Sequence, residues 1–202
     1  NQRMHQSPTL PRPLVLGSTS PYRRELLSRL NIAFDVAAPH VDETPQANEA
    51  PRALALRLAL AKAQAVALMH PQAIVIGSDQ VADLEGEPLG KPGTHEKATL
   101  QLQAMSGQTV VFQTAVAVVC ASSGFQQVDL AAVEVKFRTL DPDEIERYLQ
   151  AEKPYDCAGS AKSEGLGISL LDAIVSDDPT ALIGLPLIRT CRMLRAAGLV
   201  LP

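Results

Sequence analysis

Capping residues and apolar positions at helical spacing divide much of the chain into helices. Ser20 followed by Pro21 is typical of a helix start, because a serine side chain accepts an unpaired N–H and proline suits the first helical position. Asp141, Pro142 and Glu144 form a stronger start of the same kind. Helices are therefore predicted over residues 20–30, 50–70, 94–105, 141–152 and 186–197.

Continuous or alternating apolar runs predict strands between these helices. The run at residues 73–76 is short and wholly apolar, which fits a strand that is buried on both faces and stops at Gly77. Two long runs flank a Ser-Ser-Gly turn and predict an antiparallel hairpin over residues 109–121 and 125–138. The other predicted strands cover residues 14–16, 32–36 and 167–171, with a small hairpin at 81–89. A mixture of parallel and antiparallel strands among helices predicts an α/β fold.

The composition fits one globular domain and restricts the kinds of partner that the domain can bind. The chain has 202 residues, of which 46% are hydrophobic, so one domain over residues 14–202 is expected after a loose leader at residues 1–13. The formal net charge is -4 and no like charges run together, which disfavours a nucleic-acid partner. No apolar run reaches membrane-spanning length, and we expect no signal peptide. Three widely spaced cysteines favour a reducing compartment, the cytoplasm.

The turn between the first strand and the first helix is a candidate anion site. Arg23 and Arg24 lie in the first helical turn, where unpaired N–H groups already carry partial positive charge. Two cations there are unfavourable unless an anion binds at the end of the helix. A phosphate on the loop and helix N-terminus would resolve the conflict. This stretch alone leaves open the alternative that both arginines extend into solvent.

Two carboxylate positions are candidates for metal binding or proton transfer. Asp79 follows the strand predicted at 73–76, and ligands of open α/β sheets bind just past the strands. An aspartate there could ligate a divalent cation or take a proton from water, or it could simply cap a turn. Asp42 and Glu43 end a loop bounded by prolines, where they could also be ordinary exposed charges.

Lysines and a polar loop supply the complementary charges. Lys91 lies between a glycine and a proline, so it has little freedom to lose on binding a phosphate. Lys62 lies in the middle of the long predicted helix and could be an ordinary exposed residue. A Gly- and Ser-rich loop over residues 155–167 adds Lys162 and Glu164. None of this is a Walker or dinucleotide motif, but together the groups have the chemistry of a metal–triphosphate site.

In this order along the chain, the motifs resemble those of the Maf family of nucleotide pyrophosphatases. The motifs are Ser18-Thr19-Ser20-Pro21-Tyr22-Arg23-Arg24-Glu25-Leu26-Leu27, Val41-Asp42-Glu43, Ala61-Lys62-Ala63, Gly77-Ser78-Asp79-Gln80-Val81, Gly90-Lys91-Pro92, Cys157-Ala158-Gly159-Ser160, Gly165-Leu166-Gly167 and Gly184-Leu185-Pro186. The resemblance implies a Maf/inosine-triphosphatase-like fold, an elongated mixed β-sheet flanked by helices, with two lobes and a central cleft. It also implies cleavage of a nucleoside triphosphate to the monophosphate and diphosphate with a divalent metal, Mg²⁺ or Mn²⁺.

The resemblance also implies roles for individual residues. Asp79 matches the family's catalytic proton acceptor, and Glu43 with Asp79 would hold the metal or its water. The positions that would hold the phosphates are Ser18, Ser20, Arg23, Lys62 and Lys91. Whether Asp79 acts as base, as metal ligand or as both stays open.

Three further positions concern the choice of the nucleotide base. Many family members have a basic residue directly after the Ser-Pro pair, where this chain has Tyr22, and the other specificity positions are Gln80 and Glu164. This combination resembles the subgroup that prefers 7-methyl-GTP. Methylation at N7 makes guanine cationic, and an aromatic face and a carboxylate both attract such a ring. The alternative for Tyr22 is plain packing against its helix.

Two other functions remain open on the sequence. A pyrophosphatase acting on dTTP, UTP or another modified nucleotide would differ only in its base contacts. A non-catalytic nucleotide-binding regulator, for example of cell division, would not need a carboxylate beside the scissile phosphate, so Asp79 separates the classes. The resemblance further implies a homodimer that binds a nucleoside triphosphate, with no nucleic acid and no membrane among its partners.

Overall fold

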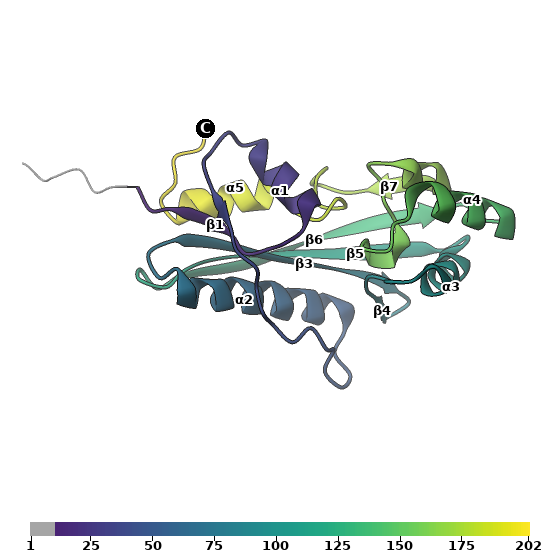
Figure 1. Cartoon of the computed structure of the whole chain (residues 1–202), viewed down its shortest axis with the longest axis horizontal. Coiled ribbons are helices and arrows are strands. Elements are labelled where there is room, and N and C mark those ends of the chain that lie inside the picture. The colour runs from purple at the N-terminus through teal and green to yellow at the C-terminus, as the bar shows by residue number, and fades with distance from the viewer. Residues whose placement is uncertain (1–10) are drawn as a thin grey trace, which may run out of the picture.

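A computed structural model describes residues 11–202 and is built on one elongated, twisted, mixed β-sheet flanked by helices (Figure 1). Most of the leader expected at residues 1–13 lies outside the described residues. Of its last three residues, Arg12 donates to the Gln72 carbonyl at 3.2 Å and Pro13 accepts from the N–H of Ile74 at 2.9 Å. These contacts attach the start of the described chain to the sheet.

The sheet has seven strands, and its order is β2-β1-β3-β5-β6-β7, with β4 paired to β3 off this path. The strands are β1 (Leu14–Leu16), β2 (Asp35–Val36), β3 (Ile74–Leu84), β4 (Glu87–Leu89), β5 (Thr109–Cys120), β6 (Phe125–Phe137) and β7 (Leu171–Val175). β1 runs parallel to β2 and β3, and the other pairs are antiparallel. The α/β class with a mixed sheet is confirmed.

The helices begin where the capping residues predict. They are α1 (Pro21–Ser28), α2 (Pro51–Met69), α3 (His95–Met105), α4 (Pro142–Glu152) and α5 (Leu187–Ala196). Ser20, Thr94 and Asp141 each accept a backbone N–H from the third residue after them. Each cap satisfies one N–H that the first helical turn leaves unpaired.

The helices cover the sheet in three groups (Figure 1). α2 lies on one face, where its alanines, among them Ala59 and Ala63, pack against Val75 and Ala117. α1 and α5 lie on the opposite face at the same end of the molecule, over the core cluster that includes Leu16. α3 and α4 pack at the other end around a separate core. The two ends form the two lobes expected of the fold.

The strand predicted at residues 73–76 does not stop at Gly77, so the expectation that Asp79 lies just past a strand was wrong. β3 continues to Leu84 because it pairs with β5 as far as Asp83↔Val111. On its other edge, β1 pairs with β3 only up to Leu16↔Ile76, and β4 begins at Ala82↔Leu89. Among the described strands, none pairs with that edge between residues 77 and 81. Asp79 therefore lies within β3, in the gap that opens where β1 ends.

Gly77 allows α2 to lie close to this part of β3. A Cβ on Gly77 would lie 2.3 Å from the Ala59 carbonyl oxygen and 2.6 Å from the Ala63 nitrogen, both in the helix backbone. Heavy atoms do not approach so closely, so only glycine fits here. The close approach brings α2 and its Lys62 next to Asp79.

The prediction of a strand at residues 167–171 was also wrong. Leu166–Leu170 form a 3₁₀ turn, and β7 begins only at Leu171. The backbone turns so tightly here that a Cβ on Gly167 would lie only 2.4 Å from the Lys162 carbonyl oxygen. The strand predicted at 32–36 is present only as Asp35–Val36, since its partner β1 is itself three residues long.

Within residues 11–202, no helix is both long enough and apolar enough to span a membrane.

Candidate active site

A polar cleft opens beside the gap along β3, between the start of α1 and the loop that follows α4. Its lining includes all but one of the residues to which the family resemblance assigns a role: Ser20, Tyr22, Arg23, Glu43, Lys62, Asp79, Gln80, Lys91 and Glu164. These residues come from six separate stretches of the chain, and the fold brings them to one place.

Ser18 is the predicted residue that does not line the cleft. Its side chain is buried, and its hydroxyl oxygen accepts the backbone N–H of Ser20 at 3.1 Å. Ser20 in turn accepts the N–H of Arg23 at 3.3 Å and caps α1. The two serines shape the turn at the start of α1, and phosphate binding by Ser18 stays a prediction.

Lys62 joins two carboxylates that lie far apart in the sequence. Its ammonium lies 2.8 Å from Glu43 Oε1 and 2.9 Å from Asp79 Oδ1. Burial raises the pKa of Asp79, although the charges of Lys62 and Arg23 oppose the rise. For Glu43, burial alone would raise the pKa, but the hydrogen bond and charge of Lys62 lower it overall. The site therefore shifts the pKa values of the two carboxylates in opposite directions, upward for Asp79 and downward for Glu43.

Glu43 and Asp79 also have the chemistry of a shared divalent-metal site. Asp79 Oδ2 is buried and has no hydrogen-bond partner among the described residues, so one oxygen is available to a ligand. No group of three or more His, Cys, Asp or Glu side chains in residues 11–202 is arranged to enclose a metal. Mg²⁺ is commonly held by one or two carboxylates and completes its shell with water and substrate phosphates. The two carboxylates fit a metal that is shared with substrate in this way.

Arg23 is a buried cation whose side chain bonds to a backbone carbonyl. Its Nε donates to the Gly184 oxygen at 2.8 Å, and Ser78 donates to the same oxygen at 3.1 Å. Burial lowers the pKa of Arg23, against the opposing charges of Asp79 and Glu43. No ion pair joins Arg23 to a carboxylate within residues 11–202, so an anionic ligand would supply the missing counter-charge. Arg24, in contrast, is exposed and lies outside the cleft lining.

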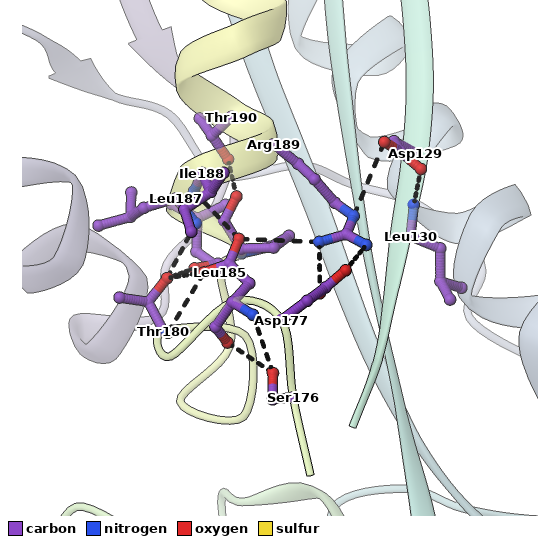
Figure 2. A network of polar contacts seen from close by, with 12 residues as sticks. Asp129, Leu130, Ser176, Asp177, Thr180, Leu185, Leu187, Ile188, Arg189 and Thr190 are labelled. Carbon is purple, nitrogen blue, oxygen red and sulfur yellow. Dashed lines mark hydrogen bonds and ion pairs between the residues drawn. The ribbon is translucent and has the colours of Figure 1, made fainter. Parts of the chain in front are cut away.

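A polar network holds the loop that carries Gly184, and sequence reasoning missed it. Figure 2 shows Arg189 reaching from α5 toward Asp129 and Asp177, and its guanidinium bonds both carboxylate oxygens of Asp177 at 2.9 and 3.1 Å. The buried Asp178 accepts the Ile188 N–H at 3.0 Å and the Thr180 hydroxyl at 3.0 Å. A Ser-Asp-Asp-Pro-Thr turn before a predicted helix is the local signal that could have indicated these contacts.

Gln80 faces the same loop from β3. Its amide nitrogen donates to the Leu182 carbonyl at 2.9 Å, to the Ala181 carbonyl at 3.2 Å and to the Thr114 hydroxyl at 3.0 Å. The predicted specificity position therefore fixes one wall of the cleft through contacts with the backbone.

Tyr22 contacts the loop after α4 rather than packing only against its own helix. Its hydroxyl donates to Asp156 at 3.1 Å from each carboxylate oxygen, and the Cys157 sulfur lies 3.9 Å from the same hydroxyl. The Lys162 ammonium lies 5.6 Å from the centre of the Tyr22 ring. Sequence reasoning missed Asp156, whose local pattern does not distinguish it from an exposed turn residue.

Comparison with known proteins gives consistent matches over nearly the whole chain. The family model described as "Maf-like protein" matches residues 13–197. A "7-methyl-GTP pyrophosphatase" of Polaromonas sp. strain JS666 is 73% identical over 190 residues, which cover 94% of this chain and 87% of that protein. Proteins of the same name from Albidiferax ferrireducens strain T118 and Aromatoleum aromaticum are 66% and 61% identical, over 96% and 94% of this chain and 97% of each protein.

Proposed function

The chain belongs to the Maf family, and from that membership we propose that it is a nucleotide pyrophosphatase that hydrolyses 7-methyl-GTP to 7-methyl-GMP and diphosphate. The observation that carries the proposal is the environment of Asp79. This carboxylate is buried in the cleft, with one oxygen bound to Lys62 and the other unpaired among the described residues. A carboxylate in that setting can take a proton from an attacking water while nearby cations hold the phosphates.

The triphosphate would bind where α1 begins. The helix N-terminus carries partial positive charge, and its cap, Ser20, lines the cleft. Arg23, Lys62 and Lys91 line the same region, and both Arg23 and Lys91 lie close enough to lower the pKa of Glu43 through their charges. Three cations from three segments would neutralise the several negative charges of a triphosphate.

Glu43 and Asp79 would hold a divalent cation, Mg²⁺ or Mn²⁺. When bound, such a cation polarises phosphoryl oxygens and offsets the charge of the departing diphosphate. Binding of this cation would also explain why one oxygen of Asp79 has no hydrogen-bond donor among the described residues.

Asp79 would orient the attacking water and accept its proton. Its burial makes the carboxylate more basic than a solvated aspartate, and the charge of Lys62 favours its ionised form. Attack of the water oxygen on the α-phosphorus breaks the bond to the bridging oxygen, and diphosphate leaves with that electron pair. Lys62, Lys91 and Arg23 would stabilise the charge that develops on the leaving group.

The base would lie beyond the phosphates, next to Tyr22 and Glu164, with Gln80 bracing the wall of the cleft. A ring made cationic by methylation at N7 is attracted by an aromatic face and by a carboxylate. A thymine or uracil ring gains neither charge interaction.

A nucleotide panel tests the proposal. Purified protein with Mg²⁺ or Mn²⁺ is assayed for diphosphate release from 7-methyl-GTP, GTP, dTTP and UTP. We expect the highest kcat/KM for 7-methyl-GTP. A preference for dTTP or UTP would overturn the proposed substrate, and the absence of diphosphate release from any nucleotide would overturn the proposed activity.

Asp79→Asn separates an enzyme from a nucleotide-binding regulator. The amide cannot accept the proton of the water, so we expect kcat to fall by about 10²- to 10⁴-fold. Nucleotide affinity, measured by calorimetry, should be largely retained because Arg23 and Lys91 remain. Unchanged turnover in Asp79→Asn would remove Asp79 from the mechanism.

The proposal extends to compartment and assembly. Cys120, Cys157 and Cys191 are free thiols, which fits the reducing cytoplasm. The net charge of -4 fits a free nucleotide rather than nucleic acid as the ligand.

Among the described strands, β7 pairs only with β6 and exposes Ile174 and Val175, which supports a homodimer. Light scattering coupled to gel filtration tests this, and a monomer at micromolar concentration would contradict it.

A further inference from the structure

Tyr22 connects the two walls of the cleft. It belongs to α1, whereas the groups around its hydroxyl and ring belong to the loop after α4. Asp156 accepts from the hydroxyl with both carboxylate oxygens at the same distance, 3.1 Å. A phenol held at its tip in this way has a defined ring orientation.

The carboxylates near Tyr22 differ in how far they are neutralised. Glu152 lies 3.3 Å from the Lys162 ammonium and takes up that charge. Within residues 11–202, no Lys, Arg or His comes within 4.0 Å of Asp156 or Glu164 to form an ion pair. Both of these side chains line the cleft. Two carboxylates that form no ion pair within 4.0 Å among the described residues therefore face the part of the cleft that holds Tyr22.

Cys157 shows that both charges act at one place. Burial raises the pKa of its thiol to about 12, and the charges of Asp156 and Glu164 each contribute to the rise. The part of the rise that comes from these two carboxylates reflects a negative potential, and a negative potential favours a cation. The cationic side chains of the cleft, in contrast, gather near Glu43 and Asp79.

The ring of Tyr22 already has a cation over it. The Lys162 ammonium lies 5.6 Å from the ring centre, within the distance at which the quadrupole of an aromatic ring attracts a positive charge. The protein's own lysine thus makes the type of contact that a cationic base would make.

We propose that Asp156 is a specificity-determining residue that selects a nucleotide with a positively charged base ring, an inference that rests on the function proposed above. It acts in two ways. Its hydrogen bonds fix the Tyr22 ring against which the base lies, and its charge attracts a cationic ring more than a neutral one. A neutral guanine gains the stacking surface but not the charge interaction.

The variant Asp156→Asn separates the charge from the hydrogen bond. Asparagine keeps an oxygen that can accept from the Tyr22 hydroxyl, so the ring stays positioned while the charge is lost. We expect kcat/KM for 7-methyl-GTP to fall about five- to tenfold and that for GTP to change by less than about twofold. Asp156→Glu should retain most of the preference. Asp172→Asn, which removes an exposed aspartate on β7 outside the cleft, is the matched control and should change neither value.

Salt dependence supplies a measurement that a purely structural role would not change. Screening weakens interactions between exposed charges, so the preference of the unmodified protein for 7-methyl-GTP over GTP should decrease as ionic strength rises. In Asp156→Asn this decrease should be smaller. A preference that is independent of salt in both proteins would contradict a charge-based selection.

Binding of the products keeps this test separate from the test of the function. The affinities of 7-methyl-GMP and GMP are measured by calorimetry for the unmodified protein and for Asp156→Asn. If neither triphosphate is hydrolysed, the proposed function fails, yet the ratio of the two affinities still reports on Asp156. An unchanged ratio in Asp156→Asn, or an equal loss for both ligands, would overturn the proposal.

Discussion

At the residue scale, Lys62 controls the charge state of the cleft. It is the only basic side chain in residues 11–202 within 4.0 Å of either Glu43 or Asp79, and it contacts both. Two carboxylates brought this close together would otherwise repel each other and raise each other's pKa. Lys62 therefore favours the ionised form of both carboxylates, which is the form that the proposed metal ion would need.

The variant Lys62→Gln should shift the pH profile of activity. In the unmodified protein, burial raises the pKa of Asp79 and the charge of Lys62 opposes that rise. Removing the opposing charge lets the pKa rise further. Since the base must be ionised, activity is lost as the pH falls through this pKa, so the acidic limb of kcat/KM should move to higher pH.

Residual turnover of Lys62→Gln is measured between pH 4.5 and pH 9, alongside Lys97→Gln as the control. Lys97 is an exposed residue of α3 outside the cleft lining. An acidic limb at the same pH in Lys62→Gln and in the unmodified protein would show that Asp79 does not set the profile. We also expect a lower kcat for Lys62→Gln, because one of the proposed phosphate-binding cations is lost.

The site residues that could be predicted from the sequence share one property: their residue type and their immediate sequence neighbours indicate their chemistry. Arg23 at a helix start and Lys91 between a glycine and a proline are examples. The missed contributions depend on distant pairing. The Gly184 carbonyl matters because Arg23, 161 positions away, donates to it, and Asp156 matters because Tyr22, 134 positions away, does the same. Local patterns contain neither relationship.

At the element scale, α5 and the loop before it act as one unit. The residue at the N-cap position of α5 is Pro186, which makes no capping bond, and Asp178 accepts the Ile188 N–H from a distance instead. Thr180 strengthens the arrangement by donating to the Leu185 carbonyl at 2.7 Å and accepting the Leu187 N–H at 2.8 Å. The loop so fixed presents the carbonyls that hold Arg23 and Gln80.

Asp178→Ala should therefore destabilise the protein and weaken catalysis together. The variant leaves the backbone N–H groups of Ile188 and Thr180 without their side-chain acceptor, which costs about 2–3 kcal/mol of the free energy of unfolding. Because the Gly184 carbonyl then loses its fixed position, kcat/KM should also fall at temperatures where the variant is folded. Urea denaturation and steady-state kinetics measure the two effects.

Asp177→Ala is the matched control for this experiment. Asp177 is adjacent in sequence and bonds Arg189, but its side chain is 71% exposed, so its loss should have a much smaller effect. Equal destabilisation by both variants would show that the ion pair with Arg189, and not the capping by Asp178, holds the loop.

The same distinction explains which elements could be predicted. Helix starts follow from caps within four residues, so α1, α3 and α4 begin where Ser20, Thr94 and Asp141 indicate. The length of β3 depends instead on pairing with β5, which starts 25 residues after β3 ends. A strand that carries Gly, Ser, Asp and Gln in its middle is stable because β5 supplies its hydrogen bonds. Nothing in the local pattern indicates such a partner.

At the scale of the whole molecule, the cleft lies between two ends of one sheet that have separate cores. Arg23 and Lys62 come from helices packed on the end of the sheet that contains β1, whereas Asp156 and Glu164 follow α4 at the other end (Figure 1). Each core is formed by apolar contacts, and Lys62 pairs with both proposed metal ligands, Glu43 and Asp79, in the absence of metal. The fold therefore does not need a metal ion to hold its parts together.

This argument predicts that removing divalent metal abolishes turnover without unfolding the protein. After treatment with EDTA, diphosphate release from 7-methyl-GTP should be lost and should return when Mg²⁺ or Mn²⁺ is added. The melting temperature without nucleotide should change by less than about 2 °C, because Lys62 already forms ion pairs with both proposed metal ligands in the free state. Adding 7-methyl-GMP with diphosphate should raise the melting temperature only when metal is present, since a ligand that binds the native state alone stabilises it.

Activity and thermal denaturation on the same samples measure both effects. Turnover that persists in EDTA would contradict a metal role for Glu43 and Asp79, and a large fall in melting temperature would contradict the conclusion that the two cores are stable on their own.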